Sequence, residues 1–275
     1  MVTPARLAIH EDAAVGLQFR ARSNTGSFDD GGHWTSSAGA EQVLEQDLAV
    51  AFRLTERAQV SALLPLIQNH RQASGIDEWG GGVGDLSVGG RYDFLQAAES
   101  LRWPGVAALV AAGIPTGTPP DQAHRLLATD ATGSGTYDLT LGLGVEKTFG
   151  AIYAGITGWV THRFSRTVSP TPGSSVMQDF GLRFTTSAVV SYVFANEAAL
   201  GGFVNWLNEG TATINGASVA GSALRLTTVG AAGLLPFTDH WRLQGTVLFD
   251  LPLSSFGMNE PAGFGLTAAM VRVWL

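Results

Sequence analysis

The chain has 275 residues, a formal net charge of −7 and no cysteine, which excludes disulfide bonds and thiolate metal sites. The acidic balance argues against nucleic acid as a partner, because nucleic acid calls for a basic face. Only 14% of the residues are charged and 45% are hydrophobic, whereas a soluble domain carries about 25% charged residues. No window approaches the roughly 18 uninterrupted apolar residues of a transmembrane helix.

The first ten residues are expected to form a short periplasmic lead. Met1 to Arg6 leads into polar sequence without the apolar core of a signal peptide. A barrel of the kind predicted below needs an export signal. We therefore expect the native signal to have been removed and a methionine to stand in its place.

Alternating apolar and polar residues predict five strands in the first part of the chain. They are expected at about 12–22, 41–54, 58–68, 85–95 and 103–114, with long polar loops at 23–40, 69–84 and 115–135. Short turns follow the second and fourth strands, at 55–57 and 96–102. The facing of the fifth strand stays open, because most of its residues are small.

The clearest signal is a hairpin in the middle of the chain. From Tyr137 to Glu146 the odd positions are aromatic or aliphatic, and the even positions are Asp, Thr, Gly or Glu. After a turn at 147–150, a second apolar-rich run covers 151–161. Each run has about ten residues, which is roughly what a tilted strand needs to cross a bilayer.

The second half of the chain predicts five more strands. They are expected at about 178–194, 198–207, 222–235, 241–251 and 264–275, separated by longer loops at 165–177, 208–221 and 252–263 and by short turns at 195–197 and 236–240. The total is twelve, and long and short connections alternate.

This pattern predicts an all-β fold: a transmembrane, antiparallel, up-and-down β-barrel of about twelve strands in the bacterial outer membrane. Residues 1–275 are expected to form this single domain, as a monomer surrounded by outer-membrane lipid. Such barrels have even strand numbers, short periplasmic turns and longer external loops. The alternative, a soluble β-sandwich, would have shorter strands and more surface charge.

The lumen is then expected to inherit the polar face of each strand. The charged residues predicted to line the channel are Asp47, Arg53, Asp85, Arg91, Asp93, Asp138, Glu146, Arg183, Arg225, Arg242, Asp250 and Arg272, and Glu45 joins them on the same face. One interpretation is that acids and bases pair within the barrel and avoid unpaired buried charge. The other is that some of them line a pathway and select solutes.

Aromatic residues near strand ends suit the girdles at the two membrane interfaces. They are Trp103, Tyr137, Tyr153, Tyr192, Trp206 and Trp241. The same alternation predicts the facing of the last strand. If Arg272 faces the lumen, Val271, Val273 and Leu275 face lipid and Trp274 points inward.

The sequence gives only a weak indication of a catalytic His/Ser pair. A twelve-stranded outer-membrane phospholipase family uses a His-x-Ser pair, whose even spacing puts base and nucleophile on one strand face. The nearest match is His162-Arg163-Phe164-Ser165, whose odd spacing separates them. The six histidines lack ligand-like spacing, so we expect no enzyme activity, no metal and no cofactor.

Two passages resemble a known family. Gly84-Asp85-Leu86-Ser87-Val88-Gly89-Gly90-Arg91-Tyr92 is similar to a strand of the outer-membrane proteins named for the MetA pathway of phenol degradation, a transporter-like family. Gly113-Ile114-Pro115-Thr116-Gly117 and Gly133-Ser134-Gly135 resemble that family's Pro-Thr-Gly loop and Gly-Ser-Gly segment. The resemblance is sharp over about residues 84–145. It implies an outer-membrane barrel that passes small hydrophobic or aromatic compounds.

Three functions follow as hypotheses. The first is a channel for passive uptake or efflux of small molecules. The second is a plugged structural or binding barrel that acts through its external loops, and the interior could be blocked by those loops or by the N-terminal lead. The third is a membrane esterase or phospholipase.

Overall fold

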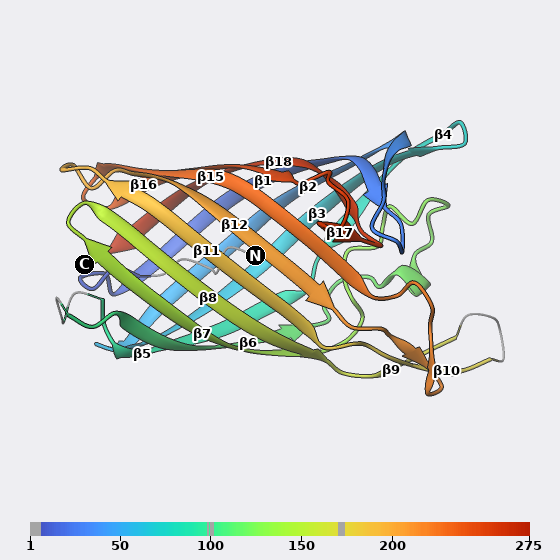
Figure 1. Cartoon of the computed structure of the whole chain (residues 1–275), viewed down its shortest axis with the longest axis horizontal. Helices are drawn as coiled ribbons and strands as arrows, with labels where there is room; N and C mark the ends of the chain where they lie inside the picture. Colours follow the sequence, from blue (N-terminus) through green and yellow to red (C-terminus); the bar gives the residue numbers. More distant parts are fainter. Residues whose placement is uncertain (1–6, 98, 100–101, 170–173) are drawn as a thin grey trace.

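The computed structural model describes residues 7–97, 99, 102–169 and 174–275, and these form a closed antiparallel β-barrel (Figure 1). Its wall consists of twelve long strands: β1 (Ala13–Phe28), β2 (Trp34–Thr55), β3 (Ala58–Ala73), β5 (Leu86–Leu95), β6 (Gly105–Ile114), β7 (Asp138–Phe149), β8 (Ile152–Arg163), β11 (Arg183–Val193), β12 (Ala199–Glu209), β15 (Leu224–Thr238), β16 (Trp241–Asp250) and β18 (Pro261–Trp274). The predicted twelve-stranded barrel is confirmed.

The order around the wall is β12, β11, β8, β7, β6, β5, β3, β2, β1, β18, β16 and β15, and β15 pairs back with β12. The first and last strands pair from Ala13–Trp274 to Ser27–Pro261. Backbone groups in hydrocarbon must be hydrogen-bonded within the protein. Closure leaves the wall without an edge that would break this rule.

Shorter elements lie beyond the wall at one end. They are β4 (Ile76–Val83), β9 (Arg166–Val168), β10 (Val176–Asp179), β13 (Thr213–Ile214), β14 (Ala217–Ser218), β17 (Gly257–Met258) and a 3₁₀ helix η1 (Pro120–Gln122). β9, β10, β13 and β14 form a separate four-stranded sheet, whereas β4 extends β3 and β17 pairs with β15. No helix among the described residues is long and apolar enough to cross a bilayer.

The two faces of the wall follow the two-residue period of the strands. On β7, Leu141 and Leu143 are 57% and 61% exposed on the outside, while Gly144 and Glu146 are buried inside. Phe249, on the distant strand β16, is also on the outside. A chain in water would bury such side chains. The outer surface is therefore the one that faces lipid, as the pattern predicts.

The connections distinguish the two ends. Two-residue turns join β2 to β3 at Glu56-Arg57, β7 to β8 at Gly150-Ala151, and β15 to β16 at Asp239-His240. The left-handed φ of +60° at Gly150 suits glycine. The other end carries the long connections (Figure 1, right). By the rule for outer-membrane barrels, the short turns are periplasmic and the long loops external.

Two predicted loops are in fact hairpin extensions. The prediction of loops at 23–40 and 69–84 is wrong, because β1 and β2 continue to pair up to Phe28–Trp34, and β3 and β4 pair up to Ala73–Ile76. Above the membrane both faces of a strand meet water, so apolar alternation stops while backbone pairing continues. Positive φ at Ser74 and Gly75, +52° and +81°, gives the tight turn.

The strand predicted at 178–194 is broken. β10 ends at Asp179 and joins the small outer sheet, and β11 starts only at Arg183. Parts of three other predictions fall outside the described residues: the lead at 1–6, the turn at 98 and 100–101, and the loop at 170–173. The facing of β6, left open by its small residues, is settled by Ala107 and Leu109, which are 0% and 7% exposed inside the barrel.

Candidate functional site

The candidate site is the barrel lumen, and the strand register decides which side chains enter it, because cross-strand partners share a face. Ten of the twelve charged residues predicted to line the lumen point inward. They are Asp47, Arg53, Asp85, Arg91, Asp93, Asp138, Glu146, Arg183, Arg242 and Asp250.

The prediction for Arg272 is wrong. Its neighbours Val271 and Val273 are 4% and 5% exposed inside the barrel, so Arg272 lies on the outer face. Its guanidinium carbon is 4.9 Å from the ring centre of Trp274 and 5.8 Å from that of Trp241. A cation between indole rings at a barrel end suits the membrane interface. Trp274 therefore points outward, the reverse of the prediction.

The prediction for Arg225 is also wrong. Arg225 pairs with Asn208 on β12, next to the outward-facing Trp206. Its Nη1 donates to the carbonyl oxygen of Ser255 at 3.5 Å, and Met258 of β17 pairs with it. Arg225 therefore holds the loop between β16 and β18 against the outward face of β15.

A buried cluster of charges covers the lumenal face of β1 and β2. Arg20 forms ion pairs with Glu45 at 2.9 Å and Asp47 at 3.3 Å, and Gln18 Nε2 donates to Asp47 at 2.7 Å. The Asp47 side chain is 0% exposed. Removing one partner would leave a desolvated charge. The cluster fits the interpretation in which acids and bases pair within the barrel.

A second cluster lies on β5, β7 and β8. Arg91 contacts Asp93 at 2.6 Å and Glu146 at 3.1 Å. Tyr153 donates its hydroxyl to Glu146 at 2.9 Å. The prediction of Tyr153 as an interfacial residue is wrong, because its ring enters the lumen to complete this cluster. The cluster therefore joins β5 to β7 and β8 across the inner face of β6.

A third cluster lies toward the external mouth. Glu209, 3% exposed, pairs with Arg163 and, at 2.6 Å, with Arg183. Asp138 is the cross-strand partner of Arg163. The Phe180 ring lies 4.2 Å from the Arg163 guanidinium carbon, in a cation–π contact. Arginines from β8 and β11 thus share one buried carboxylate.

A fourth cluster lies at the same mouth, on β1, β15 and β16. Arg22 pairs with Asp250 at 2.6 Å, and Thr228 and the Gly263 N–H also donate to that carboxylate. Glu260, just before β18, is near this group. Burial raises the pKa of the Glu260 carboxyl, and the charges of Arg183 and Arg22 oppose that rise.

Loop 115–137 is fastened to the inner wall at Asp85. The Asp85 carboxylate accepts hydrogen bonds from the Gly117 N–H at 3.0 Å and from the N–H and hydroxyl of Ser134 at 2.6 and 2.8 Å. The three sequence passages that carry the family resemblance therefore meet at one carboxylate. Arg166 also pairs with Asp121 at 2.9 Å, which joins this loop to the next one.

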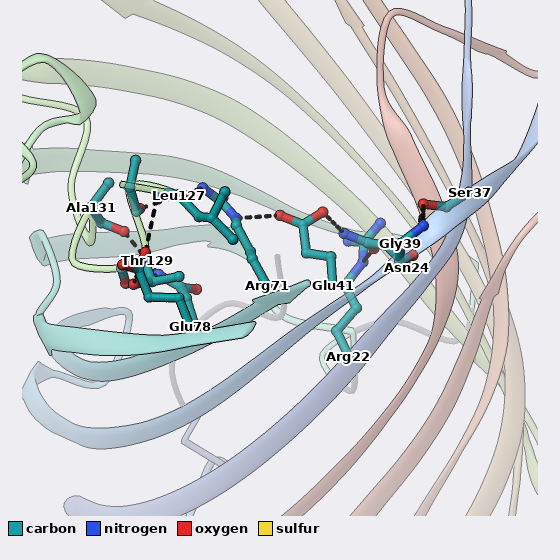
Figure 2. Close-up of polar contacts among 12 residues, drawn as sticks. Arg22, Asn24, Ser37, Gly39, Glu41, Arg71, Glu78, Leu127, Thr129 and Ala131 are labelled. Carbon is teal, nitrogen blue, oxygen red and sulfur yellow. Dashed lines mark hydrogen bonds and ion pairs between the residues drawn. The ribbon is translucent and has the colours of Figure 1, made fainter. Parts of the chain in front are cut away.

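The same loop packs on the inward face of the β3–β4 hairpin (Figure 2). Asn69 donates to the carbonyls of Thr129 and Ala131 at 3.0 and 2.9 Å, and Arg71 donates to that of Leu127 at 2.8 Å. Glu78 accepts from the Leu127 N–H at 2.8 Å. Thr129 is fully buried. The loop is thus part of the external mouth rather than a free surface segment.

Glycine makes this packing possible. A Cβ at Gly80 would clash with the backbone and hydroxyl of Thr129, at 2.6 and 2.5 Å, whereas one at Gly82 would be in ordinary contact with Thr132. Only glycine lets another backbone approach this closely, because it has no Cβ. The glycine run after Trp79, predicted as loop, is a strand shaped to receive loop 115–137.

Part of the lumen is apolar, which the sequence reasoning missed. The apolar lumen face comprises six side chains from β6, β8, β12, β15 and β16: Leu109, Trp159, Phe203, Leu207, Leu226 and Leu248. Gly142 and Gly230 leave room for the rings of Trp159 and Phe203. Parity could have revealed Trp159, Leu226 and Leu248, which share the face of a threonine or of Asp250 on their strands. The strands predicted for Leu109, Phe203 and Leu207 offered no charge or threonine on that face.

The apolar lumen face and the first charge cluster are on opposite sides. In the ring of twelve strands, β8 and β1 are six places apart, as are β11 and β2. Arg20, Glu45 and Asp47 therefore face the wall that carries Trp159 and Leu207. The β1–β2 side of the lumen thus carries the Arg20 cluster, and the facing wall combines apolar surface with the Arg91–Glu146 and Arg183–Glu209 pairs.

The candidate catalytic pair is not assembled. His162 faces outward and its ring contacts Phe164 at 5.1 Å between centroids. Ser165 lies beyond the end of β8. Among the described residues, no group of three or more His, Asp or Glu side chains could hold a metal ion.

Comparison with known proteins relies on structure. No family model and no curated protein matches the sequence. An outer membrane channel from Pseudomonas putida F1 is similar at a TM-score of 0.81 and 18% identity, covering 100% of this chain and 99% of that one. The translocator domain of the autotransporter NalP from Neisseria meningitidis follows at 0.55 and 11%, covering 96% and 88%. The transport unit of AIDA-I from Escherichia coli gives 0.52 and 9%, covering 100% and 94%.

These likenesses concern the fold alone. Together with the closed wall, the apolar outer surface and the unequal loops, they define the class to which the chain belongs: a bacterial outer-membrane β-barrel.

Proposed function

We propose that this barrel is a channel for passive diffusion of small molecules that combine an apolar or aromatic body with a polar group. The observation that carries the proposal is the apolar lumen face, which lies across the lumen from the Arg20 cluster. The apolar part of a solute could contact Trp159, Leu207 and Leu226 while its polar group faces the paired charges around Arg20. Such contacts are weak, as a pathway needs, because solutes must leave as readily as they enter.

The paired charges support this solute class over inorganic ions. Glu146 is held by Arg91 and Tyr153, and Asp47 is held through its Oδ2 by Arg20 and Gln18, while its Oδ1 has no hydrogen-bond partner among the described residues. A carboxylate held in this way offers little to a passing cation that would have to give up its hydration. The resemblance to the phenol-degradation group points the same way, and the structural similarity to an outer membrane channel from Pseudomonas putida F1 supports a channel.

The test is flux into liposomes that contain the purified protein. 4-Hydroxybenzoate, an aromatic anion that crosses bare lipid slowly, is compared with gluconate, an aliphatic anion of similar size. We expect the aromatic anion to enter several-fold faster, by a route absent from protein-free liposomes. Equal rates would remove the aromatic preference, and flux at the protein-free background would remove the channel.

A second candidate, a plugged barrel that acts through its external loops, is favoured by one observation. Hydrogen bonds to Asp85, Asn69 and Glu78 hold loop 115–137 against the inner wall at the external mouth. A variant with this loop shortened that conducts in planar bilayers, while the parent gives none, would support the plugged barrel. Conductance by the parent would exclude it.

A further inference from the structure

The N-terminal segment, residues 7–12, lies inside the periplasmic mouth. Leu7 is 4% exposed and belongs to a buried apolar cluster with Ala14, Ala51, Val271 and Val273, which are inward-facing residues of β1, β2 and β18. A segment that merely led into the first strand would leave Leu7 in water. The cluster gives the segment an apolar anchor at the barrel wall.

A buried ion pair fixes the other end of the segment. Glu11 is 3% exposed, and its carboxylate accepts from Arg242 Nη1 at 2.7 Å and from the Ala8 N–H at 2.8 Å. Arg242 projects inward from β16. Arg242 and, from β2, Arg53 were both predicted to line the channel. Both instead bind the N-terminal segment.

Arg53 and Gln59 complete the attachment. Arg53 Nε donates to the Glu11 carbonyl at 2.7 Å, and its Nη2 donates to the Ala8 carbonyl. Gln59 Oε1 accepts from the Leu7 N–H at 3.2 Å. The contacts come from β16, β18, β1, β2 and β3, which are five consecutive strands in the ring of twelve. The segment therefore crosses nearly half of the inner circumference.

A space remains beside the segment. A cavity of about 640 Å³ lies between Ala8, His10 and Glu11 on one side and the β11–β12 and β15–β16 turns, with Asn196 and Asp239, on the other. We infer that the N-terminal segment is a fixed restriction of the periplasmic mouth, latched by Glu11, Arg242 and Arg53, and that solutes leave the lumen through the cavity beside it. The second half of this inference rests on the proposed channel function.

The position of the segment can be tested without any transport. The chain has no cysteine, so Leu7→Cys supplies a single thiol whose reaction with a maleimide measures exposure. We expect slow labelling in the otherwise unaltered protein, and labelling roughly ten-fold faster or more once Arg242→Met breaks the latch and local opening becomes easier. Arg57→Met is the matched control, because it removes an Arg–Glu pair at the same barrel end that does not touch the segment.

If Arg242→Met alone fails to fold, the double variant Glu11→Gln/Arg242→Met removes both charges, and heat-modifiable gel mobility reports folding. Two results would overturn the inference. One is a thiol at position 7 that labels as fast as the thiol of Asn196→Cys in an exposed turn, and the other is a labelling rate unaffected by the latch variants.

Transport then tests the restriction itself. A variant lacking residues 1–11 is compared with the parent in planar bilayers and in liposomes with solutes of increasing size. We expect higher single-channel conductance and a larger size limit for the shortened chain. Identical conductance and size limits would overturn the restriction. Absence of flux in both, with latch-dependent labelling of the thiol at position 7, would reject the channel function and leave the segment's placement standing.

Discussion

Asp85 and Ser134 are 49 positions apart in the sequence, yet one carboxylate oxygen of Asp85 accepts both the N–H and the hydroxyl of Ser134, at 2.6 and 2.8 Å. The other oxygen accepts the Gly117 N–H. Both ends of loop 115–137 are thereby tied to the start of β5. The carboxylate replaces the strand pairing that the loop lacks, and this is why the loop follows the inner wall.

Replacing Asp85 by alanine should free the loop. Hydrogen bonds to a charged group contribute about 1.5–3 kcal/mol each, so loss of three should make loop 115–137 sensitive to protease in folded protein. The measurement is limited proteolysis, with cleavage sites found by mass spectrometry. Asp77→Asn serves as the control, because Asp77 lies in the same hairpin region and bonds only to His70 among the contacts described. Equal cleavage of both variants would contradict the role given to Asp85.

The Arg20 cluster should matter more to stability than an exposed pair. Arg20→Met leaves Asp47, which is 0% exposed, without its counter-charge, and we expect the free energy of unfolding to fall by about 3–5 kcal/mol. Arg57→Met breaks an exposed pair with Glu99 and should cost less than about 1 kcal/mol. Urea unfolding in lipid vesicles measures both. Similar losses would mean that Asp47 is not held by Arg20 as described.

Trp159 should affect aromatic solutes selectively. Trp159→Gln removes the largest ring of the apolar lumen face, so the flux of 4-hydroxybenzoate should fall several-fold while that of gluconate changes little. Leu141→Val, on the lipid face of β7, is the control and should change neither flux. If both solutes slowed equally in Trp159→Gln, the residue would be acting on pore shape alone.

Glu260 should make stability depend on pH. Because burial raises its pKa in the folded chain, the folded state binds a proton more readily than the unfolded state does. The free energy of unfolding should therefore increase as pH falls from the raised pKa toward the ordinary value of 4.5. Glu260→Gln should flatten the profile in that window. A parent profile that declines there, or one unchanged in the variant, would contradict the burial of this carboxyl.

Much of the wall could be predicted from the sequence because lipid and lumen impose opposite demands on alternate residues. Leu141 and Phe249 had to face out, and Arg20 and Asp47 had to face in. Where both faces of a strand meet water, neither face has to be apolar. The hairpin extensions around Phe28 and Ser74 therefore show no alternation of apolar and polar residues. The facing of the last strand was predicted wrongly because Arg272 was assigned to the lumen, although Phe264, Leu266 and Met270 share its parity and face outward.

The inner lining was harder to predict than the wall. Asp85 was expected to line a pathway, but its partners lie on a loop whose course no periodic pattern describes. Arg53 and Arg242 are engaged by residues 7–12, which carry a single apolar anchor, Leu7. The apolar lumen face escaped notice because residues such as Trp159 and Leu207 stand in stretches where both faces are apolar, so alternation gave no contrast.

The most direct measurement is a nitroxide scan along β7, with one cysteine at a time from position 139 to 145, in lipid bilayers. Relaxation by oxygen reports contact with hydrocarbon, and relaxation by a water-soluble nickel chelate reports contact with water. Oxygen should dominate at Leu139, Leu141, Leu143 and Val145, and nickel at Thr140, Gly142 and Gly144, in strict two-residue alternation. A scan without alternation, or one with the two sets exchanged, would contradict a membrane barrel with a polar lumen.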